Sequence, residues 1–366
     1  MTRKNRILFA TSGTAPGYRR ESLYTDHVAR ALAPWYDLDV LCPMIGRSGH
    51  VIDFHGARLL RVPLPSEGAE GAEALARAMR RQLSDGLYDS VHVRTPVEGE
   101  AALALHEQFG YTLIYEPSPP SQLMGFLSGH GTQAALRRLH EVEQCLVTAS
   151  DVLVVHSGRA FERAAHARGS EGSIVRVPPG VDMDCFCPMP VASEEPPFVL
   201  ILDEPHSGLG DLPNIRSRGL DEPWGPERWK PEAPADLALA LAGSAACLAL
   251  PPPTWSAWLD ATPYGVLEAA ACLKPVIAPR LPDVMEVLGE GSEHLLYDPA
   301  VPGEAVRLAH AVLDQPLAYA PLVESIGQRV RAAFPATILR SRLVSLYAGI
   351  VEAHAEPPIV PVPAAD

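Results

Sequence analysis

A carboxylate lies close to an expected helix start in the stretch from Thr262 to Ala278, TPYGVLEAAACLKPVIA. Pro263 suits the first turn of a helix, and we expect a short apolar helix with Glu268 near its start. The segment after Pro275 is typical of a buried parallel strand. A helix N-terminus offers N–H groups and partial positive charge to an anion, and a nearby carboxylate can accept hydrogen bonds from sugar hydroxyls. The stretch therefore suits a sugar diphosphate, and a helix–turn–strand unit with a solvated or capping glutamate is the alternative.

The same stretch resembles the donor-site signature of the family-four glycosyltransferases, which are retaining enzymes with the GT-B fold. One form of that signature reads approximately T-P-x-K-x-L-E-A-M-A-x-G-x-P-V-I-A. Gly265, Ala270 and Leu273 stand where that form has lysine, methionine and glycine. A commoner form has a first glutamate eight positions before the second, and Asp260 stands there. The matching positions are Thr262, Pro263, Leu267, Glu268, Ala269, Ala271, Pro275, Val276, Ile277 and Ala278.

The resemblance implies that this stretch binds a nucleotide-sugar donor. The residues concerned would be Glu268, Asp260, Gly265, Val266 and Leu267. Enzymes of this kind need no metal or other cofactor and show no obvious protein nucleophile. Catalysis would then rest on positioning and on stabilisation of the leaving diphosphate. The resemblance therefore implies transfer of a sugar, with retention of anomeric configuration, to an acceptor that the sequence does not identify.

The segment from Phe198 to Pro205, FVLILDEP, departs from the family's pattern. It resembles a later strand of the family's second domain, so that one strand, one helix and the arginine and lysine that hold the diphosphate are missing. Arg216, Arg218 and Lys274 are the predicted substitutes. This shortening is the basis of the alternative function, a catalytically inactive relative that acts as a partner or regulatory subunit.

Strands and helices alternate along the N-terminal half, which predicts a doubly wound parallel sheet. Ligands of such sheets lie outside the carboxyl ends of the strands, where Gly13, His92 and Glu116 are expected. His92 is the predicted catalytic residue, hydrogen-bonding a sugar or acceptor, and a histidine satisfied at a strand end is the alternative. The expected strands are 7–10, 37–42, 59–62, 90–93, 112–115, 152–155 and 174–177, and the expected helices are 21–33, 71–83 and 133–148.

The resemblance extends across this half. Tyr88–His92 is similar to the family's "FDVVH" strand, and Val177–Asp182 is similar to the "IPNGVD" that ends the first domain. The small-residue loop from Gly13 to Gly17 corresponds to the family's glycine loop, which faces the acceptor and the transferred sugar. It lacks the usual Gly-Gly pair.

The resemblance implies an α/β protein with the GT-B fold, in which two Rossmann-like domains face a cleft. The boundaries are 1–188 for the acceptor domain and 198–330 for a shortened nucleotide-sugar domain, joined by a proline-rich linker. A last helix at about 338–353 is expected to cross back to the first domain, and the tail 354–366 is expected to be disordered. The insert 221–235, rich in proline and tryptophan, is a predicted lid, protein-partner surface or irregular loop.

Charge and hydropathy exclude several classes of protein. The formal net charge of −14 argues against a broad nucleic-acid interface. Apolar runs are shorter than a membrane span, and the N-terminus is typical of a strand rather than a signal peptide, so we expect a cytoplasmic protein. Peripheral contact of arginine clusters with an anionic membrane is an alternative to a solvated surface. The six cysteines form no paired CxxC motif, so we expect no zinc site.

Overall fold

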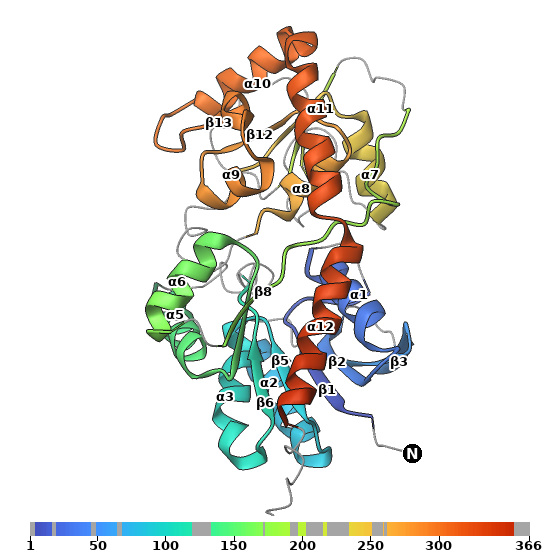
Figure 1. The fold of residues 1–366 in the computed structure, drawn as a ribbon, viewed down its shortest axis with the longest axis vertical. Coiled ribbons are helices and arrows are strands. Elements are labelled where there is room, and N and C mark those ends of the chain that lie inside the picture. Colours follow the sequence, from blue (N-terminus) through green and yellow to red (C-terminus); the bar gives the residue numbers. More distant parts are fainter. Residues whose placement is uncertain are drawn as a thin grey trace, which may run out of the picture.

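The computed structural model describes most of the chain, and it consists of two lobes, each built on its own sheet (Figure 1). The first lobe contains every strand up to residue 176, and the second contains every strand from residue 199 onward. The predicted pair of Rossmann-like sheets is therefore confirmed. The described residues are 4–16, 20–44, 49–63, 68–118, 133–170, 173–190, 197–202, 215–217, 234–250, 259 and 262–354.

The sheet of the first lobe has the strand order β3-β4-β2-β1-β5-β6-β7-β8. All neighbours are parallel except β3, which pairs antiparallel with β4 through a turn at His55 and Gly56. Both turn residues have positive φ, as a tight hairpin requires. The sequence-based expectations did not include β3, the antiparallel strand at this edge. The strands are β1 Arg6–Ala10, β2 Asp37–Met44, β3 Val51–Phe54, β4 Ala57–Pro63, β5 Ser90–Val93, β6 Thr112–Tyr115, β7 Val152–Val155 and β8 Ile174–Arg176.

Helices cover both faces of this sheet. One face packs against α2 Gly68–Asp85, α3 Pro96–Phe109, α5 Gln133–Ala149 and α6 Gly158–Arg168, and the other packs against α1 Arg20–Leu32 and α12 Ala336–His354. The sequence-based expectations omitted α3, although Thr95 and Glu98 form a capping box at its start. They also omitted α6, which Ser157 caps.

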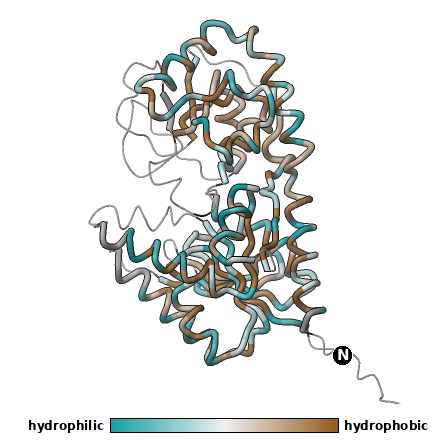
Figure 2. Tube along the Cα trace, turned by 60° about the vertical axis from the view of Figure 1, so that its left-hand side comes forward, coloured by the Kyte–Doolittle hydropathy of each residue, from teal (hydrophilic) through white to brown (hydrophobic). Residues whose placement is uncertain are grey.

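The sheet of the second lobe is wholly parallel among its described strands, in the order β10-β9-β11-β12-β13. Its strands and helices bury one apolar core, and the hydrophobic chain segments gather inside each lobe in Figure 2. The strands are β9 Val199–Ile201, β10 Ile215–Ser217, β11 Ala246–Leu248, β12 Val276–Pro279 and β13 Leu296–Tyr297. The helices are α7 Pro234–Gly243, α8 Tyr264–Ala271, α9 Pro282–Leu288, α10 Glu304–Asp314 and α11 Pro316–Ala333, with a 3-10 turn at Ser292–Leu295.

Two crossings of the chain between the lobes, at Val181 and at Phe334–Ala336, are bonded to each other. The N–H of Val181 donates to the carbonyl of Phe334 at 2.9 Å, and the N–H of Ala336 donates to the carbonyl of Val181 at 2.7 Å. After the second crossing, α12 packs on the first lobe (Figure 1). The lobes are therefore joined by one paired connection rather than by two independent linkers.

Gly180 lies where this connection meets α12. A Cβ atom added there would be 2.6 Å from Cβ of Leu339 and 2.9 Å from Cα of Ala336. We expect Gly180→Ala to lower the free energy of unfolding by about 1–3 kcal/mol, since backbone must shift to make room. Urea denaturation measures the change. The matched control is Gly349→Ala on α12, where an added Cβ meets nothing within 4 Å, and we expect it to be stabilising by roughly 0.5–1 kcal/mol. Equal effects of both substitutions would contradict the close approach.

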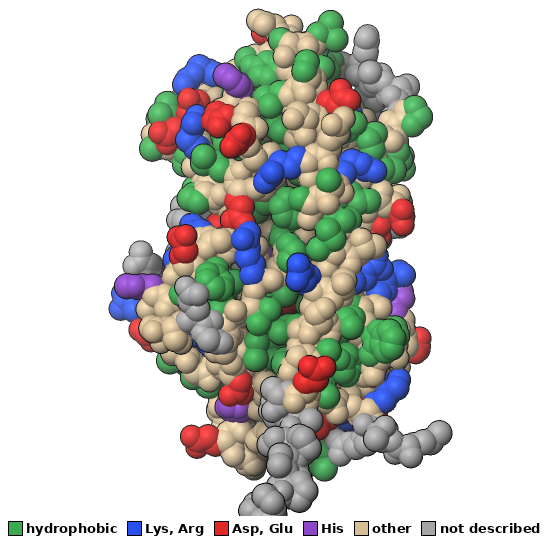
Figure 3. Space-filling model, in the orientation of Figure 1, with side chains coloured by type: hydrophobic (Ala, Val, Ile, Leu, Met, Phe, Trp, Pro, Cys, Tyr) green, Lys and Arg blue, Asp and Glu red, His purple; other side chains and the backbone are tan. Residues whose placement is uncertain are grey.

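The surface carries charges of both signs. On the face in Figure 3, acidic and basic side chains are interspersed over both lobes. The described part of this face therefore presents no long basic stripe that a polyanion could follow. No helix in the described part of the chain is long and apolar enough to cross a membrane.

Candidate functional site

A buried carboxylate, Glu116, is the centre of a polar cluster at the carboxyl edge of the first sheet. The O–H of Tyr24 on α1 donates to its Oε2 at 2.7 Å, and Nε2 of His92 on β5 lies 3.1 Å from the same oxygen. Nε of Arg94 and Nε2 of His156 each lie 3.1 Å from Oε1. We call these five residues the Glu116 cluster. Its members come from α1 and from the ends of β5, β6 and β7, the sheet edge at which open α/β proteins bind ligands.

The Glu116 cluster holds an ionised carboxylate in a buried place. Burial alone would raise the pKa of Glu116, but Arg94 and the two histidines outweigh it and hold this pKa well below its usual range. Burial and the Glu116 charge raise the pKa of Tyr24, so its hydroxyl stays a donor. The guanidinium carbon of Arg94 lies 3.9 Å from the centre of the Tyr24 ring, a cation–π contact.

The second lobe reaches this cluster through Tyr264, the first residue of α8. The Tyr264 ring centre lies 6.4 Å from that of Tyr24 and 6.4 Å from that of His156, with the rings edge to face. Pro263 is the N-cap residue and supplies no side-chain cap. The N-terminus of α8, which carries Gly265, Val266 and Leu267 in its buried first turns, therefore faces the Glu116 cluster across the boundary between the lobes.

Glu268 lies beyond the first turn of α8 and is almost fully buried. Its charge acts on Cys185, whose pKa is raised to about 11 by burial and then by Asp182 and Glu268. Cys185 belongs to the first crossing between the lobes. Glu268 is thus at the junction of α8 with that crossing, and a simple helix-terminal role does not fit its position.

The end of α8 explains one departure from the donor-site signature. Leu273 has φ of 55°, in the left-handed region that favours glycine. Its N–H bonds to the carbonyl of Ala270 at 2.9 Å, and the N–H of Lys274 bonds to that of Ala269 at 3.1 Å. Such a left-handed residue is a common way to end a helix. At the position of the signature's glycine, this chain therefore forms the left-handed turn with a leucine.

The structure separates Lys274 from the N-terminus of α8. Its ammonium donates to the carbonyls of Ala242 and Ser244, the latter at 3.1 Å, beside the end of α7. Because Lys274 precedes β12, it lies at the amino edge of the second sheet, opposite the cluster. The other predicted substitutes are Arg216, whose side chain lies outside the described residues, and Arg218, which lies outside them altogether, as does Asp260.

His92 is fully buried in the structure. Its Nδ1 lies 2.8 Å from the hydroxyl of Tyr347 on α12, and its Nε2 faces Glu116. Both ring nitrogens therefore point at protein groups, as the alternative reading of a satisfied strand-end histidine expects. Direct contact of His92 with a substrate stays a prediction.

The loop after β1 approaches α1 closely at Gly13. The N–H of Gly13 bonds to Oγ1 of Thr11 at 3.1 Å, and an added Cβ would lie 2.3 Å from Cβ of Glu21. Glycine is therefore required for this approach, beside the helix that carries Tyr24. Gly17, the other residue predicted on the acceptor side, lies outside the described residues.

Carboxylates of α9 join the lobes beside the site. Oε2 of Glu286 accepts from the N–H of Gly158 at the start of α6, at 2.8 Å, and its Oε1 pairs with Arg176. Oδ2 of Asp283 lies 3.4 Å from Nε of Arg159. These contacts hold α9 against the first lobe and fix α8, which packs beside it, relative to the Glu116 cluster.

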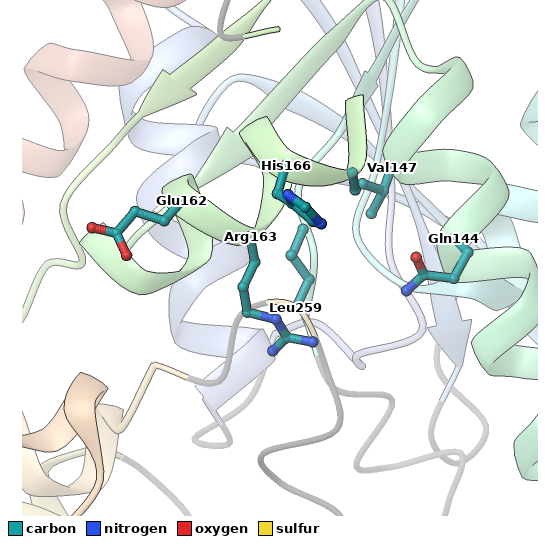
Figure 4. Close-up of a pocket in the computed structure, with 7 residues that line it drawn as sticks. Gln144, Val147, Glu162, Arg163, His166 and Leu259 are labelled. Atoms are coloured by element: carbon teal, nitrogen blue, oxygen red, sulfur yellow. The ribbon is translucent and has the colours of Figure 1, made fainter. Parts of the chain in front are cut away.

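A separate pocket of about 380 Å³ opens between α5 and α6 (Figure 4). Leu259 from the second lobe reaches it, and its N–H lies 3.2 Å from Oε1 of Glu143. In Figure 4 the side chains of Arg163 and His166 lie near Leu259, and Glu162 points away. This pocket lies among the outer helices of the first sheet, away from the Glu116 cluster. Among the described residues, no group of three or more His, Cys, Asp or Glu side chains is placed to hold a metal ion.

Comparison with known proteins gives a short match to curated sequences. No family model matches the chain. D-inositol 3-phosphate glycosyltransferases of Paenarthrobacter aurescens and Pseudarthrobacter chlorophenolicus are each 31% identical to it over 111 residues. These residues are 30% of this chain and 27% and 26% of the two relatives, so the match spans about a quarter of their length.

Solved structures match nearly the whole chain. The sucrose-phosphate synthase of Thermosynechococcus elongatus gives a TM-score of 0.74 at 16% identity, covering 96% of this chain and 100% of that one. Anabaena HepE, in complex with UDP and glucose, gives 0.66 at 14% identity, covering 94% and 100%. The calicheamicin glycosyltransferase CalG4 gives 0.52 at 16% identity, covering 98% and 100%. The fold of this chain is therefore the GT-B fold of glycosyltransferases.

Proposed function

We propose that this chain is a retaining glycosyltransferase that takes a sugar from a nucleotide-sugar donor bound between α8 and the Glu116 cluster. The observation that carries the proposal is the contact of Tyr264, at the N-terminus of α8, with Tyr24 and His156. It brings a helix N-terminus, which favours anions, opposite a charged cluster at a strand edge. Solved structures of similar fold hold UDP with glucose and UDP-glucose, which supports this class of donor.

The proposed reaction exchanges two bonds at the anomeric carbon of the sugar. The bond from that carbon to the diphosphate oxygen breaks, and a bond to an acceptor hydroxyl oxygen forms on the same face. The hydroxyl proton leaves with the diphosphate, so atoms and charge balance. The protein's part is to orient donor and acceptor and to stabilise the developing negative charge. Several further points stay predictions. They are the acceptor, the absence of a metal requirement, a cytoplasmic location, membrane contact and a protein partner at residues 221–235.

A thermal-shift panel of UDP-, GDP- and ADP-sugars tests the proposed function. A donor at 100 times its Kd stabilises the folded chain by about 2.7 kcal/mol, which raises Tm measurably. The responsive donor is then incubated with the protein, and release of nucleoside diphosphate is followed. No response to any donor at millimolar concentration would refute the proposal and favour the inactive partner.

Glu268→Gln tests the role of the buried α8 carboxylate. If Glu268 accepts hydrogen bonds from donor hydroxyls, loss of its charge is expected to raise the donor Kd about tenfold or more. Calorimetric titration of the donor found in the panel measures this change. The control is Glu324→Gln on the exposed side of α11, which is expected to bind like the wild type. Equal dissociation constants for all three proteins would count against Glu268 as a ligand.

A further inference from the structure

The charge state of His156 follows from what its ring nitrogens face. Nδ1 lies 2.7 Å from the carbonyl oxygen of Val177, and Nε2 lies 3.1 Å from Oε1 of Glu116. A carbonyl and an ionised carboxylate only accept hydrogen bonds, so both nitrogens must donate. A histidine that donates from both nitrogens is an imidazolium. His156 therefore carries a positive charge at a buried position.

His92 differs, because Tyr347 can donate to it. The Tyr347 hydroxyl lies 2.8 Å from Nδ1, and burial and the charge of Glu116 raise the pKa of this tyrosine. Nδ1 of His92 therefore has a donor even when the ring is neutral. Within the Glu116 cluster, two cations, Arg94 and His156, thus surround one carboxylate. With a neutral His92, the cluster carries one net positive charge.

This positive charge lies opposite the N-terminus of α8. The rings of His156 and Tyr24 are the groups that touch Tyr264, and Glu116 holds both of them. On the other side of the boundary, Lys274 is bonded to backbone carbonyls at the far edge of the second sheet. Arg94 and His156 of the first lobe are thus two described cations close to Tyr264 at the N-terminus of α8, and Glu116 contacts both of them.

We propose that Glu116 is a positioning residue for the sugar transfer. It keeps His156 as an imidazolium, and through His156 and Tyr24 it fixes the position of the Tyr264 ring. This inference rests on the proposed function. A fixed positive charge opposite α8 stabilises negative charge on the departing diphosphate without reorganisation during the reaction. The titratable groups that face the carboxylate or its partners are Tyr24 and Glu21 of α1, His92 of β5, Arg94, His156, Tyr264 of α8 and Tyr347 of α12.

Glu116→Gln is the decisive variant, because it keeps the shape of the side chain and removes its charge. We expect kcat to fall on the order of 100-fold, as for a small misplacement of reacting groups, with KM nearly unchanged. Because the imidazolium loses its counter-ion, the alkaline limb of the pH–rate profile is expected to move to lower pH. Glu116→Asp, which keeps the charge, should restore the profile and part of kcat.

The control is Glu98→Gln, at another fully buried glutamate near the same sheet edge. Burial raises the pKa of Glu98 to about 7. Its oxygens accept hydrogen bonds from the hydroxyl of Thr95 and from backbone N–H groups of the capping box. Glutamine serves equally well at this position of a capping box. We therefore expect Glu98→Gln to keep the wild-type kcat and pH profile.

Nitrogen-15 NMR of histidine-labelled protein without any donor separates this inference from the proposed function. The wild type and Glu98→Gln are expected to show, at pH 8, one imidazole with both nitrogens protonated, which His156→Gln removes. Loss of that signal in Glu116→Gln, together with the kinetic change, supports the inference. A wild-type kcat and an intact signal in Glu116→Gln would overturn it.

If no donor binds the wild type, the proposed function and the catalytic role fail together, and the NMR signal still decides whether Glu116 holds the charged histidine. Should Glu116→Gln not fold, His156→Gln tests the same charge by kcat and by NMR, and Glu116→Asp, which keeps the charge, is expected to retain the signal.

Discussion

Replacement of Arg94 by methionine is expected to lower the free energy of unfolding by about 3–5 kcal/mol. Methionine keeps most of the length of the side chain but leaves the buried carboxylate of Glu116 without its guanidinium partner. His156 is then the one remaining cation of the Glu116 cluster, and removal of one partner of a buried pair is much more costly than the loss of an exposed pair. Urea denaturation at pH 7 measures the change, with the slope of the transition checked against the wild type.

Two further variants identify the cause of this loss. Arg138→Met removes an exposed arginine that pairs with Glu100 at 2.9 Å, and no measurable change is expected. Adding Glu116→Gln to Arg94→Met removes the other half of the pair, so the loss in the double variant is expected to be smaller than the sum of the losses in the two single variants. A double variant whose losses simply add would show that the two side chains do not interact.

Acidification between pH 6.5 and pH 4 is expected to destabilise the chain by roughly 3 kcal/mol through His27 alone. Burial lowers the pKa of this α1 histidine from 6.5 to about 4, with Arg340 and Arg30 adding to the effect and Asp26 and Asp182 opposing it. Below pH 6.5 the unfolded chain binds a proton that the folded chain does not. Stability is therefore complete above pH 6.5 for this group and falls until the folded state also binds the proton, near pH 4.

His27→Leu removes this titration. Among the described residues no hydrogen-bond partner is found for Nδ1 of His27, so leucine should cost little at pH 7. Urea denaturation at several pH values is expected to show a weaker pH dependence for His27→Leu than for the wild type. His294→Gln, at an exposed position, serves as the control and should keep the wild-type dependence. The same slope in His27→Leu and in the wild type would contradict the assignment.

Local patterns in the sequence predicted most of the elements, and they placed His92 and Glu116 at one sheet edge. Arg94 and His156 each follow a predicted strand as well, so the same rule would have found them. What the sequence could not predict is which of these side chains meet. The convergence of Arg94 and His156 on Glu116 depends on the register of three strands far apart in the chain.

The second lobe shows the same limit. The helix containing Glu268 was predicted, but not the contact of Tyr264 with the first lobe, because docking between lobes leaves no periodic signal. Lys274, six residues after Glu268, was predicted to substitute for a missing phosphate-binding cation. The helix and turn between them carry Lys274 to the opposite edge of the sheet, where it bonds the end of α7. Distance along the chain was therefore a poor guide to distance in the site.

The position of α12 has a consequence for how the chain folds during synthesis. Leu339, Leu343 and Tyr347 fill one face of the first sheet, yet they are made only after the whole second lobe. At a ribosomal rate of about 5–20 residues per second, the part of that face under α12 stays uncovered for on the order of ten seconds, while α1 covers the rest. During this interval the nascent first lobe thus exposes an apolar surface, and chaperones bind such surfaces. Ribosome-bound chains that end before residue 336 should bind such chaperones more strongly than the released protein.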